Sequence, residues 1–399
     1  MVSPIPKRPC WVEISTRALE DNYQFLRTAA PAEAELLAIV KADAYGHSLV
    51  LCAPAAVRAG ARWLGVTSIE EAAAARSLCP EARLVVMGGM FPGQETAVIE
   101  RGLIPVVWEE SHLDALEIAL NPANAPAGSV AVHLEIDSGM SRQGVAPDAM
   151  DKVLARFGKV SGVRIEAVMT HLYASDESAG VSTKNQLVRL EEALSRIMRR
   201  YAPEWLSVGA SAALLGNDAG EIAALARRFG MKLMLRPGLA LYGVLPRFEP
   251  PFRSEEEPPA LAAARRNLRP VLAWKTRVVS LRDVPSGTEI GYNGTFVATE
   301  PMRLALIALG YADGLDRRLG NRFELLVRGR RAPLVGRISM DQAVLDVTGL
   351  DGVEPGDEVV IIGSQGNETI TAFDHADRAG TIPWEVFTRI GERVARMEV

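Results

Sequence analysis

Short apolar runs alternate with helical patterns over about the first 240 residues of the chain. The run from Leu36 to Val40 is uninterrupted, which is typical of a strand buried on both faces. Eight such runs are predicted as strands: Leu36–Lys41, Trp63–Thr67, Leu84–Met87, Ile104–Trp108, Val130–Ile136, Ile165–Met169, Trp205–Val208 and Leu233–Arg236. Stretches rich in Ala, Leu, Glu and Arg lie between them and predict amphipathic helices at 48–59, 69–77, 94–100 and 182–201.

This alternation predicts an α/β fold. Strand–helix–strand units build parallel sheets, and eight of them close into a (β/α)8 barrel of the TIM type, expected over residues 12–244. An open doubly wound sheet is the alternative. It is disfavoured because no Gly-x-Gly-x-x-Gly sequence opens a first helix.

The pattern changes after Tyr242. Residues 247–267 are rich in Pro, Glu and Arg and predict a linker or an insertion. Turn sequences such as Pro285-Ser286-Gly287 then separate short strands, which predicts a second, mostly β domain over residues 245–399. Its strands are expected at Val271–Leu281, Arg303–Leu309, Glu324–Val327, Val344–Val347 and Glu358–Ile362.

The composition is that of a two-domain globular protein. Its 399 residues suit two domains, and a hydrophobic content of 48% supplies a sizeable core. The net charge of -5 leaves no basic footprint for nucleic acid. No apolar run reaches the length of a membrane span and no secretory signal is visible, so we expect a cytoplasmic protein without a membrane partner. Three scattered cysteines, Cys10, Cys52 and Cys79, fit a reducing compartment and give no metal signature.

Polar side chains follow several predicted strands at their carboxyl ends, where chemistry collects in barrels of this type. They stand in five segments: Lys41, Asp137–Arg142, Thr170-His171, Gly209–Ser211 and Arg236–Leu239. Each residue alone has a plainer interpretation, since Lys41 could reach solvent, Arg142 could be a surface charge and His171 a structural histidine. Their shared position at one predicted rim favours a functional site.

Lys41 suggests the chemistry. Burial lowers the pKa of a lysine, and a neutral amine is what a Schiff base requires. The loops after the seventh and eighth strands of such barrels often bind phosphate, and here they hold the Ser211 hydroxyl and the open backbone of Gly238. A pyridoxal phosphate site requires a Schiff-base lysine, hydrogen-bond donors to the phosphate and a partner for the pyridine nitrogen, which Arg236 could supply.

The segment Ala38–His47, Ala-Ile-Val-Lys-Ala-Asp-Ala-Tyr-Gly-His, resembles the pyridoxal phosphate attachment motif of bacterial alanine racemases, which are fold type III enzymes. Further segments are similar to this family, in the same order: 137–145, 170–177, 236–243, 291–295, 309–314 and 336–342. The resemblance therefore covers nearly the whole chain. It also implies that the leader, residues 1–14, joins the second domain around Cys10–Ile14.

The resemblance implies a role for each matching residue. Lys41 would bind pyridoxal 5'-phosphate covalently and act as one of two catalytic bases, with Tyr292 as the other. The phosphate would be held by Tyr45, Ser211, Gly238 and Leu239, while Arg236 would face the pyridine nitrogen and bond His171 beside the ring. Arg142 would orient the substrate, and Tyr311, Met340 and Asp341 would close the substrate pocket from the other subunit of a homodimer.

By the same resemblance the protein is an isomerase that interconverts L-alanine and D-alanine and supplies D-alanine for peptidoglycan. Two bases are needed because racemisation removes a proton from one face of Cα and returns one to the other. A broader racemase acting on serine or lysine and a fold-related decarboxylase of basic amino acids are alternatives. A non-catalytic pyridoxal phosphate carrier and a Schiff-base aldolase without a cofactor are others. The segments Tyr-Asn-Gly-Thr at 292–295 and Ser-Met-Asp-Gln at 339–342 favour the racemase.

Three positions depart from the family pattern. Ala210 stands where relatives usually carry asparagine, and Trp384 stands where they carry a tyrosine that bonds the phosphate. An indole donates one hydrogen bond and accepts none, so phosphate binding is expected to be weaker or rearranged. Glu135 replaces a carbamylated lysine found in many relatives. It could supply the same negative charge near Arg142, or form an ordinary ion pair lining the barrel.

Overall fold

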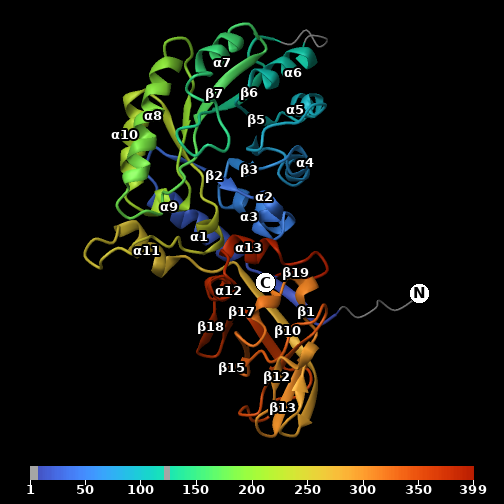
Figure 1. Ribbon diagram of the computed structural model, residues 1–399. Helices are drawn as coiled ribbons and strands as arrows, with labels where there is room; N and C mark the ends of the chain where they lie inside the picture. The colour runs from blue at the N-terminus through green and yellow to red at the C-terminus, as the bar shows by residue number, and fades with distance from the viewer. Residues whose placement is uncertain (1–7, 121–125) are drawn as a thin grey trace. The chain divides into compact units, whose positions relative to one another are not determined.

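The computed structural model describes residues 8–120 and 126–399 and divides them into two compact units (Figure 1). The described residues between 17 and 269, except 45–48, form the first unit. The second unit contains residues 8–16, 45–48 and 270–399. Residues 45–48, which begin four positions after the predicted attachment lysine Lys41, therefore group with the second unit rather than with their sequence neighbours.

Eight parallel strands close into a barrel in the first unit (Figure 1), which confirms the predicted α/β fold class. The strands are β2 (Glu35–Ile39), β3 (Trp63–Val66), β4 (Arg83–Val86), β5 (Ile104–Val107), β6 (Val130–Glu135), β7 (Val163–Met169), β8 (Trp205–Ser207) and β9 (Lys232–Leu235). Closure comes from β9, which pairs with β2 through Met234 and Leu235. All five residues of β2 are buried, as expected for a strand covered on both faces.

Helix α1 (Thr16–Ala29) precedes the first barrel strand, and further helices follow most of the strands. These are α3 (Leu49–Arg58), α4 (Ile69–Leu78), α5 (Glu95–Glu100), α6 (Glu110–Leu120), α7 (Met150–Phe157), α8 (Val181–Ile197), α9 (Ser211–Leu215) and α10 (Asp218–Arg228). The Ser68 hydroxyl caps α4 by accepting the Glu71 N–H at 3.2 Å. The segment 247–267, predicted as a linker or insertion, contains α11 (Pro259–Asn267) and groups with the barrel unit.

A nine-stranded sheet organises the second unit. Its strands are β1 (Cys10–Ile14), β10 (Leu272–Val284), β13 (Met302–Ile307), β14 (Glu324–Val327), β15 (Arg330–Pro333), β16 (Ala343–Asp346), β17 (Glu358–Gln365), β18 (Glu368–Ile370) and β19 (Ala395–Glu398). The leader strand β1 lies between two later strands, antiparallel to β10 and parallel to β19. Two helices, α12 (Ala372–Ala379) and α13 (Pro383–Thr388), precede β19.

A small apolar core supports one end of this sheet. It contains Val284, Ile290, Ala298, Met302, Leu304 and Val335. Ile290 ends the two-residue strand β11 (Glu289–Ile290), which pairs with β12 (Phe296–Val297). The short turn η3 (Tyr292–Gly294) connects these two strands, so the core anchors the segment that carries Tyr292.

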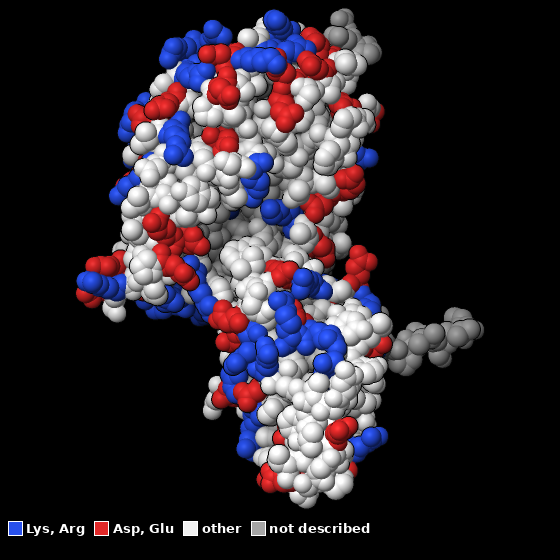
Figure 2. All heavy atoms as spheres, viewed as in Figure 1, with Lys and Arg blue, Asp and Glu red and all other residues white. Residues whose placement is uncertain are grey.

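Acidic and basic side chains alternate over the visible face of the barrel (Figure 2). Ion pairs of the barrel unit include Arg156 with Asp114 at 2.6 Å and with Glu117 at 2.5 Å, and Lys232 with Glu204 at 2.7 Å. The Lys232–Glu204 pair is exposed on both sides, and exposed pairs contribute little to stability. Among the residues that the structure describes, no helix combines the length and apolar character needed to cross a membrane.

Candidate active site

Lys41 begins a left-handed turn directly after β2. The turn, α2 (Lys41–Tyr45), holds Ala42, Asp43, Ala44 and Tyr45 at φ values between 52° and 55°. Left-handed backbone is unfavourable for every residue with a Cβ, so four such residues in a row need compensation. The strand therefore ends at Ile39, two residues before the predicted end, because the chain reverses its handedness there.

Two carboxylates compensate the turn. Glu71 accepts the Ala42 N–H at 2.7 Å with one oxygen and the Thr67 N–H at 2.7 Å with the other. Asp43 accepts the Leu49 N–H at 2.6 Å. These charge-assisted bonds satisfy the Ala42 N–H within the turn and connect the turn to the starts of α3 and α4 through the Leu49 and Thr67 N–H groups. Glu71 was not predicted as a site residue, although its spacing from Ser68 is that of a capping box.

The surroundings of Lys41 favour its neutral amine. Burial lowers its pKa, and the cations Arg142 and Arg236 lower it further, while Glu71 acts in the opposite direction. A lysine with these neighbours can supply the uncharged nitrogen that a Schiff base requires.

Arg236 is the most enclosed cation of the barrel mouth. It is 4% exposed and donates to the Ser207 carbonyl at 2.5 Å, the Ser207 hydroxyl at 3.0 Å and the Thr170 carbonyl at 2.7 Å. Burial lowers its pKa to about 10, with Glu135 opposing the shift, so the guanidinium remains charged at neutral pH. These three acceptors hold the guanidinium in one orientation.

His171 faces this guanidinium as a neutral ring. Its Nδ1 lies 3.4 Å from Arg236 Nη2. Burial lowers the pKa of His171 to about 3, and the nearby charges of Arg236, Arg142 and Lys41 add to the shift. Because the imidazole is uncharged, Nδ1 can accept a hydrogen bond from the arginine.

Ser211 and the segment after β9 form a cluster of hydrogen-bonding groups. The Ser211 hydroxyl, 6% exposed at the start of α9, accepts the N–H groups of Gly238 and Ala240, both at 3.1 Å. Leu239 follows Gly238 and starts the turn η2 (Leu239–Tyr242). One hydroxyl and two converging N–H groups are donors of the kind that bind phosphate oxygens. Ala210 precedes Ser211 and offers only a methyl group, so it adds no polar contact.

Glu135 lies buried at the carboxyl end of β6, 2% exposed. The Gln143 amide donates to this carboxylate and also to the Met87 carbonyl, the latter at 2.9 Å. Burial raises the pKa of Glu135, whereas Arg236, Gln143 and Arg142 act to lower it. Gln143 was missed by the sequence interpretation, because a glutamine beside an exposed arginine gives no signal that it folds back onto a buried acid.

The second unit presents three exposed side chains from its predicted site loops. Tyr292 is 65% exposed, Tyr311 is 42% exposed and Met340 is 53% exposed. Gly291 precedes Tyr292 at φ +75°, and a Cβ there would lie 3.0 Å from the Arg337 nitrogen. Only glycine fits this close backbone approach without strain.

The loops of Tyr311 and Met340 are joined to each other. Tyr311 starts the turn η4 (Tyr311–Asp313), and its N–H donates to the Ser339 carbonyl at 3.0 Å. The next N–H, of Ala312, donates to the Met340 carbonyl at 3.0 Å. These bonds make Tyr311, Met340 and the neighbouring Asp341 parts of one structural element.

The second half of the attachment motif packs onto α13, the helix that carries Trp384. The His47 ring meets the Phe387 ring edge-on with centroids 4.8 Å apart, and a Cβ on Gly46 would overlap the Phe387 carbonyl oxygen. Tyr45 is 9% exposed, and burial raises its pKa to about 12. Trp384 is 37% exposed on the same helix.

The predicted site residues thus divide between the two units. The barrel carries Lys41, Arg142, His171, Ser211, Arg236, Gly238 and Leu239 at the carboxyl ends of its strands. The second unit carries Tyr45, Tyr292, Tyr311, Met340, Asp341 and Trp384.

Family models match both parts of the chain. The model for the N-terminal domain of alanine racemase matches residues 14–246, and the model for its C-terminal domain matches residues 271–398. The chain belongs to the alanine racemase family. Curated relatives agree: the alanine racemase of Symbiobacterium thermophilum is 37% identical over 392 residues, which is 98% of this chain and 97% of that protein. The alanine racemase of Halothermothrix orenii is 35% identical over 390 residues, 98% of this chain and 96% of that protein.

Solved structures of the family share the fold. The alanine racemase from Bacillus anthracis with bound L-Ala-P has a TM-score of 0.87 and 30% identity, over 100% of this chain and 96% of that one. The alanine racemase from Bartonella henselae with covalently bound pyridoxal phosphate has a TM-score of 0.83 and 27% identity, over 98% of this chain and 99% of that one.

Proposed function

We propose that the protein is a pyridoxal phosphate-dependent racemase that interconverts L-alanine and D-alanine. The observation that carries the proposal is Lys41, an amine with a lowered pKa at the carboxyl end of a barrel strand, beside Arg236 and His171. Membership of the alanine racemase family supports this assignment.

The barrel residues fit pyridoxal phosphate. Lys41 would bind its aldehyde carbon, while Ser211, with the backbone of Gly238 and Leu239, would hold the phosphate. Arg236 would face the ring nitrogen, and a guanidinium that stays charged can only donate a hydrogen bond there. When bound, the coenzyme withdraws electrons from the substrate Cα and makes its proton removable.

This chain's own residues would then move the proton. Lys41 would take or return a proton on one face of Cα, and Tyr292 would do the same on the opposite face. Arg142 would hold the substrate carboxylate through a charge-assisted bond. The neutral His171 would keep Arg236 oriented without adding a positive charge beside the ring.

Two copies of the chain would share these sites. Tyr292, Tyr311 and Met340 are 65%, 42% and 53% exposed in a single chain, which leaves their side chains accessible to a second copy of the chain. In a homodimer each chain would present these three side chains to the barrel of the partner chain. Tyr45 and Trp384 would contribute to binding of the phosphate. The symmetry of such a pair would give two equivalent sites.

We further propose that the protein acts in the cytoplasm and that the D-alanine it forms is used to build peptidoglycan. Expression of the chain in a bacterium that requires added D-alanine should remove that requirement. Persistent dependence on D-alanine, with the folded protein present, would argue against this role.

The purified protein tests the activity directly. A visible absorbance band from the lysine-bound coenzyme is expected, and L-alanine should become a mixture of both isomers. Serine and lysine should be assayed beside alanine, because the Ala210 methyl leaves room that an asparagine would fill and so favours a broader substrate range. Release of carbon dioxide from lysine without racemisation of alanine would point to a decarboxylase instead.

A further inference from the structure

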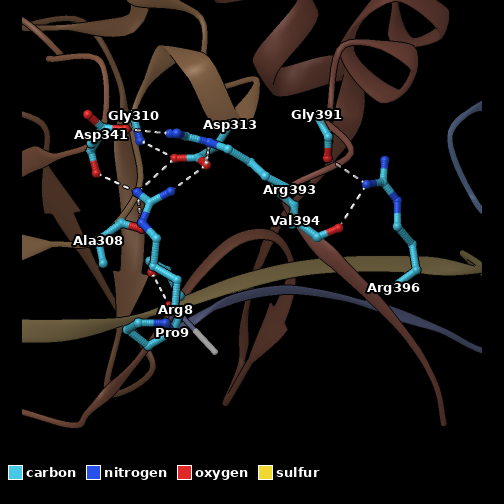
Figure 3. Close-up of polar contacts among 11 residues, drawn as sticks. Arg8, Pro9, Ala308, Gly310, Asp313, Asp341, Gly391, Arg393, Val394 and Arg396 are labelled. Carbon is cyan, nitrogen blue, oxygen red and sulfur yellow. Dashed lines mark hydrogen bonds and ion pairs between the residues drawn. The ribbon is translucent and has the colours of Figure 1, made fainter. Parts of the chain in front are cut away.

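Two arginines from opposite ends of the chain bind one buried carboxylate in the second unit (Figure 3). The Asp313 side chain is 1% exposed. Arg8 donates to its two oxygens at 2.7 and 3.0 Å, and Arg393 donates to it at 2.7 Å. The Gly310 N–H adds a fourth bond at 2.8 Å. Four N–H donors therefore bind the Asp313 carboxylate.

The same arginines also hold the neighbouring loop. Arg8 donates to the Asp341 carbonyl at 2.6 Å, and Arg393 donates to the Asp341 carboxylate at 2.7 Å. Arg8 further reaches the Ala308 carbonyl at 2.9 Å. Each arginine thus bridges the Tyr311 turn and the Met340 loop, as Figure 3 shows for the contacts with Asp313 and Asp341.

The charges of this network balance, with two guanidinium groups facing two carboxylates. Burial alone would raise the pKa of Asp313, but the bonds from Arg8, Arg393 and Gly310 outweigh it and hold the pKa below its usual range. The acid therefore stays ionised at neutral pH and keeps its bonds. Charge-assisted bonds between planar groups have a well-defined geometry, so the network fixes the backbone at both loops.

We propose that Arg8 and Arg393 are positioning residues of the active site, which fix the two loops from which Tyr311 and Met340 project. This inference rests on the proposed function, because it assumes that these two side chains complete a substrate pocket. The sequence interpretation gave no sign of it, since Arg8 and Asp313 are separated by 305 positions.

The test compares Arg8→Leu and Arg393→Leu with the control Arg330→Leu. Arg330 is an exposed arginine of the same unit that donates to the Gly349 carbonyl at 2.9 Å. Amide hydrogen exchange is measured at residues 310–314 and 339–342 of the coenzyme-loaded dimer, and KM and kcat for alanine are measured beside it. Both test variants should exchange faster in the two loops and lose about tenfold or more in kcat/KM, mainly through KM. The control should match the unmodified protein.

Arg8→Lys keeps the charge but loses the planar fork, so its values should lie between those of Arg8→Leu and the unmodified protein. If Arg8→Leu does not fold, Arg8→Lys decides by the same two readouts. Folded variants with unchanged KM and unchanged loop exchange would overturn the proposal, even if their melting temperature falls. Failure of the proposed function would show differently, as an unmodified protein that does not racemise alanine.

Discussion

At the scale of single residues, the left-handed turn after Lys41 is conformationally strained and depends on hydrogen bonds with neighbouring residues. Glu71 accepts one backbone N–H with each carboxylate oxygen. Glu71→Gln keeps the shape of the side chain but replaces one carboxylate oxygen with an NH2 group. This new donor would face the N–H of Ala42 or of Thr67 and could not bond it. We expect a loss of about 1–2 kcal/mol in the free energy of unfolding, measured with urea, and weaker coenzyme binding in a titration followed by visible absorbance.

Glu70→Gln is the matched control for this prediction. Glu70 lies beside Glu71 on α4, and its carboxylate accepts the Gln94 amide at 3.1 Å at the surface. Equal urea midpoints and equal coenzyme affinities for the two variants would show that the turn does not depend on Glu71.

His133 makes the stability of the barrel depend on pH. It is fully buried in β6 beside Trp63, and burial, with Arg236 and Arg83 nearby, lowers its pKa to about 3. Because the folded pKa lies below the unfolded value of about 6.5, the unfolded state binds the proton first. The contribution of His133 is therefore complete above about pH 6.5 and is lost progressively as the pH falls toward 3.

His133→Leu should flatten this dependence. Among the described residues neither ring nitrogen of His133 has a hydrogen-bond partner, and the nearest carboxylate, that of Glu166, lies 4.0 Å from Nε2, so leucine removes no hydrogen bond. The slope of unfolding free energy against pH should decrease by about 1.4 kcal/mol per unit below pH 6, since one proton fewer is taken up. An unchanged slope would mean that His133 does not titrate between the folded and unfolded states.

At the scale of elements, the link between the attachment motif and α13 can be tested at Gly46. Its φ is +77°, and a Cβ there would overlap the Phe387 carbonyl oxygen. Gly46→Ala therefore adds a steric clash to the left-handed strain of about 1–2 kcal/mol. We expect a clear loss of stability in urea together with weaker coenzyme binding, because Tyr45 and α13 would no longer keep their spacing.

Gly60→Ala separates strain from packing. Gly60 has φ +100°, but no atom of the described residues lies within 4 Å of the position that a Cβ would occupy. The Gly60→Ala variant should therefore lose stability only through backbone strain, and its affinity for the coenzyme should be unchanged. If both variants lose the same stability and neither loses coenzyme, then the contact with α13 does not support the site.

The elements that the sequence predicted well are those whose burial leaves a mostly apolar run. All eight barrel strands lie within about two residues of their predicted positions, although β6 contains His133 and β7 contains Arg164 and Glu166. Strands such as β15 (Arg330–Pro333) were missed, since three of its four residues are exposed and it carries two arginines. The left-handed turn was missed as well, because Ala, Asp, Ala and Tyr give no local sign of positive φ.

The candidate site divides in the same way. Lys41, His171, Ser211 and Arg236 were predicted because each stands at or near the end of a recognisable strand. Glu71, Gln143, Arg8 and Arg393 act through partners that only the folded chain brings near. Sequence patterns reveal periodicity among neighbouring residues, whereas most of these contacts join residues that are distant in the sequence.

At the scale of the whole molecule, Lys41 and Tyr292, the two residues proposed as catalytic bases, lie in different units of the chain. If each site takes Lys41 from one chain and Tyr292 from the other, neither residue can act without a second copy of the chain. Lys41→Ala and Tyr292→Phe should each abolish racemisation when the variants are measured alone. Both should still form dimers.

Mixing the two variants is the most direct measurement of this claim. After subunit exchange at equal concentrations, half of the dimers combine both variants, and each such dimer holds one site with both native residues. Racemisation of alanine should therefore return to about a quarter of the specific activity of the unmodified protein. A mixture that forms mixed dimers, confirmed by mass, and yet remains as inactive as its two components would contradict a site shared between chains.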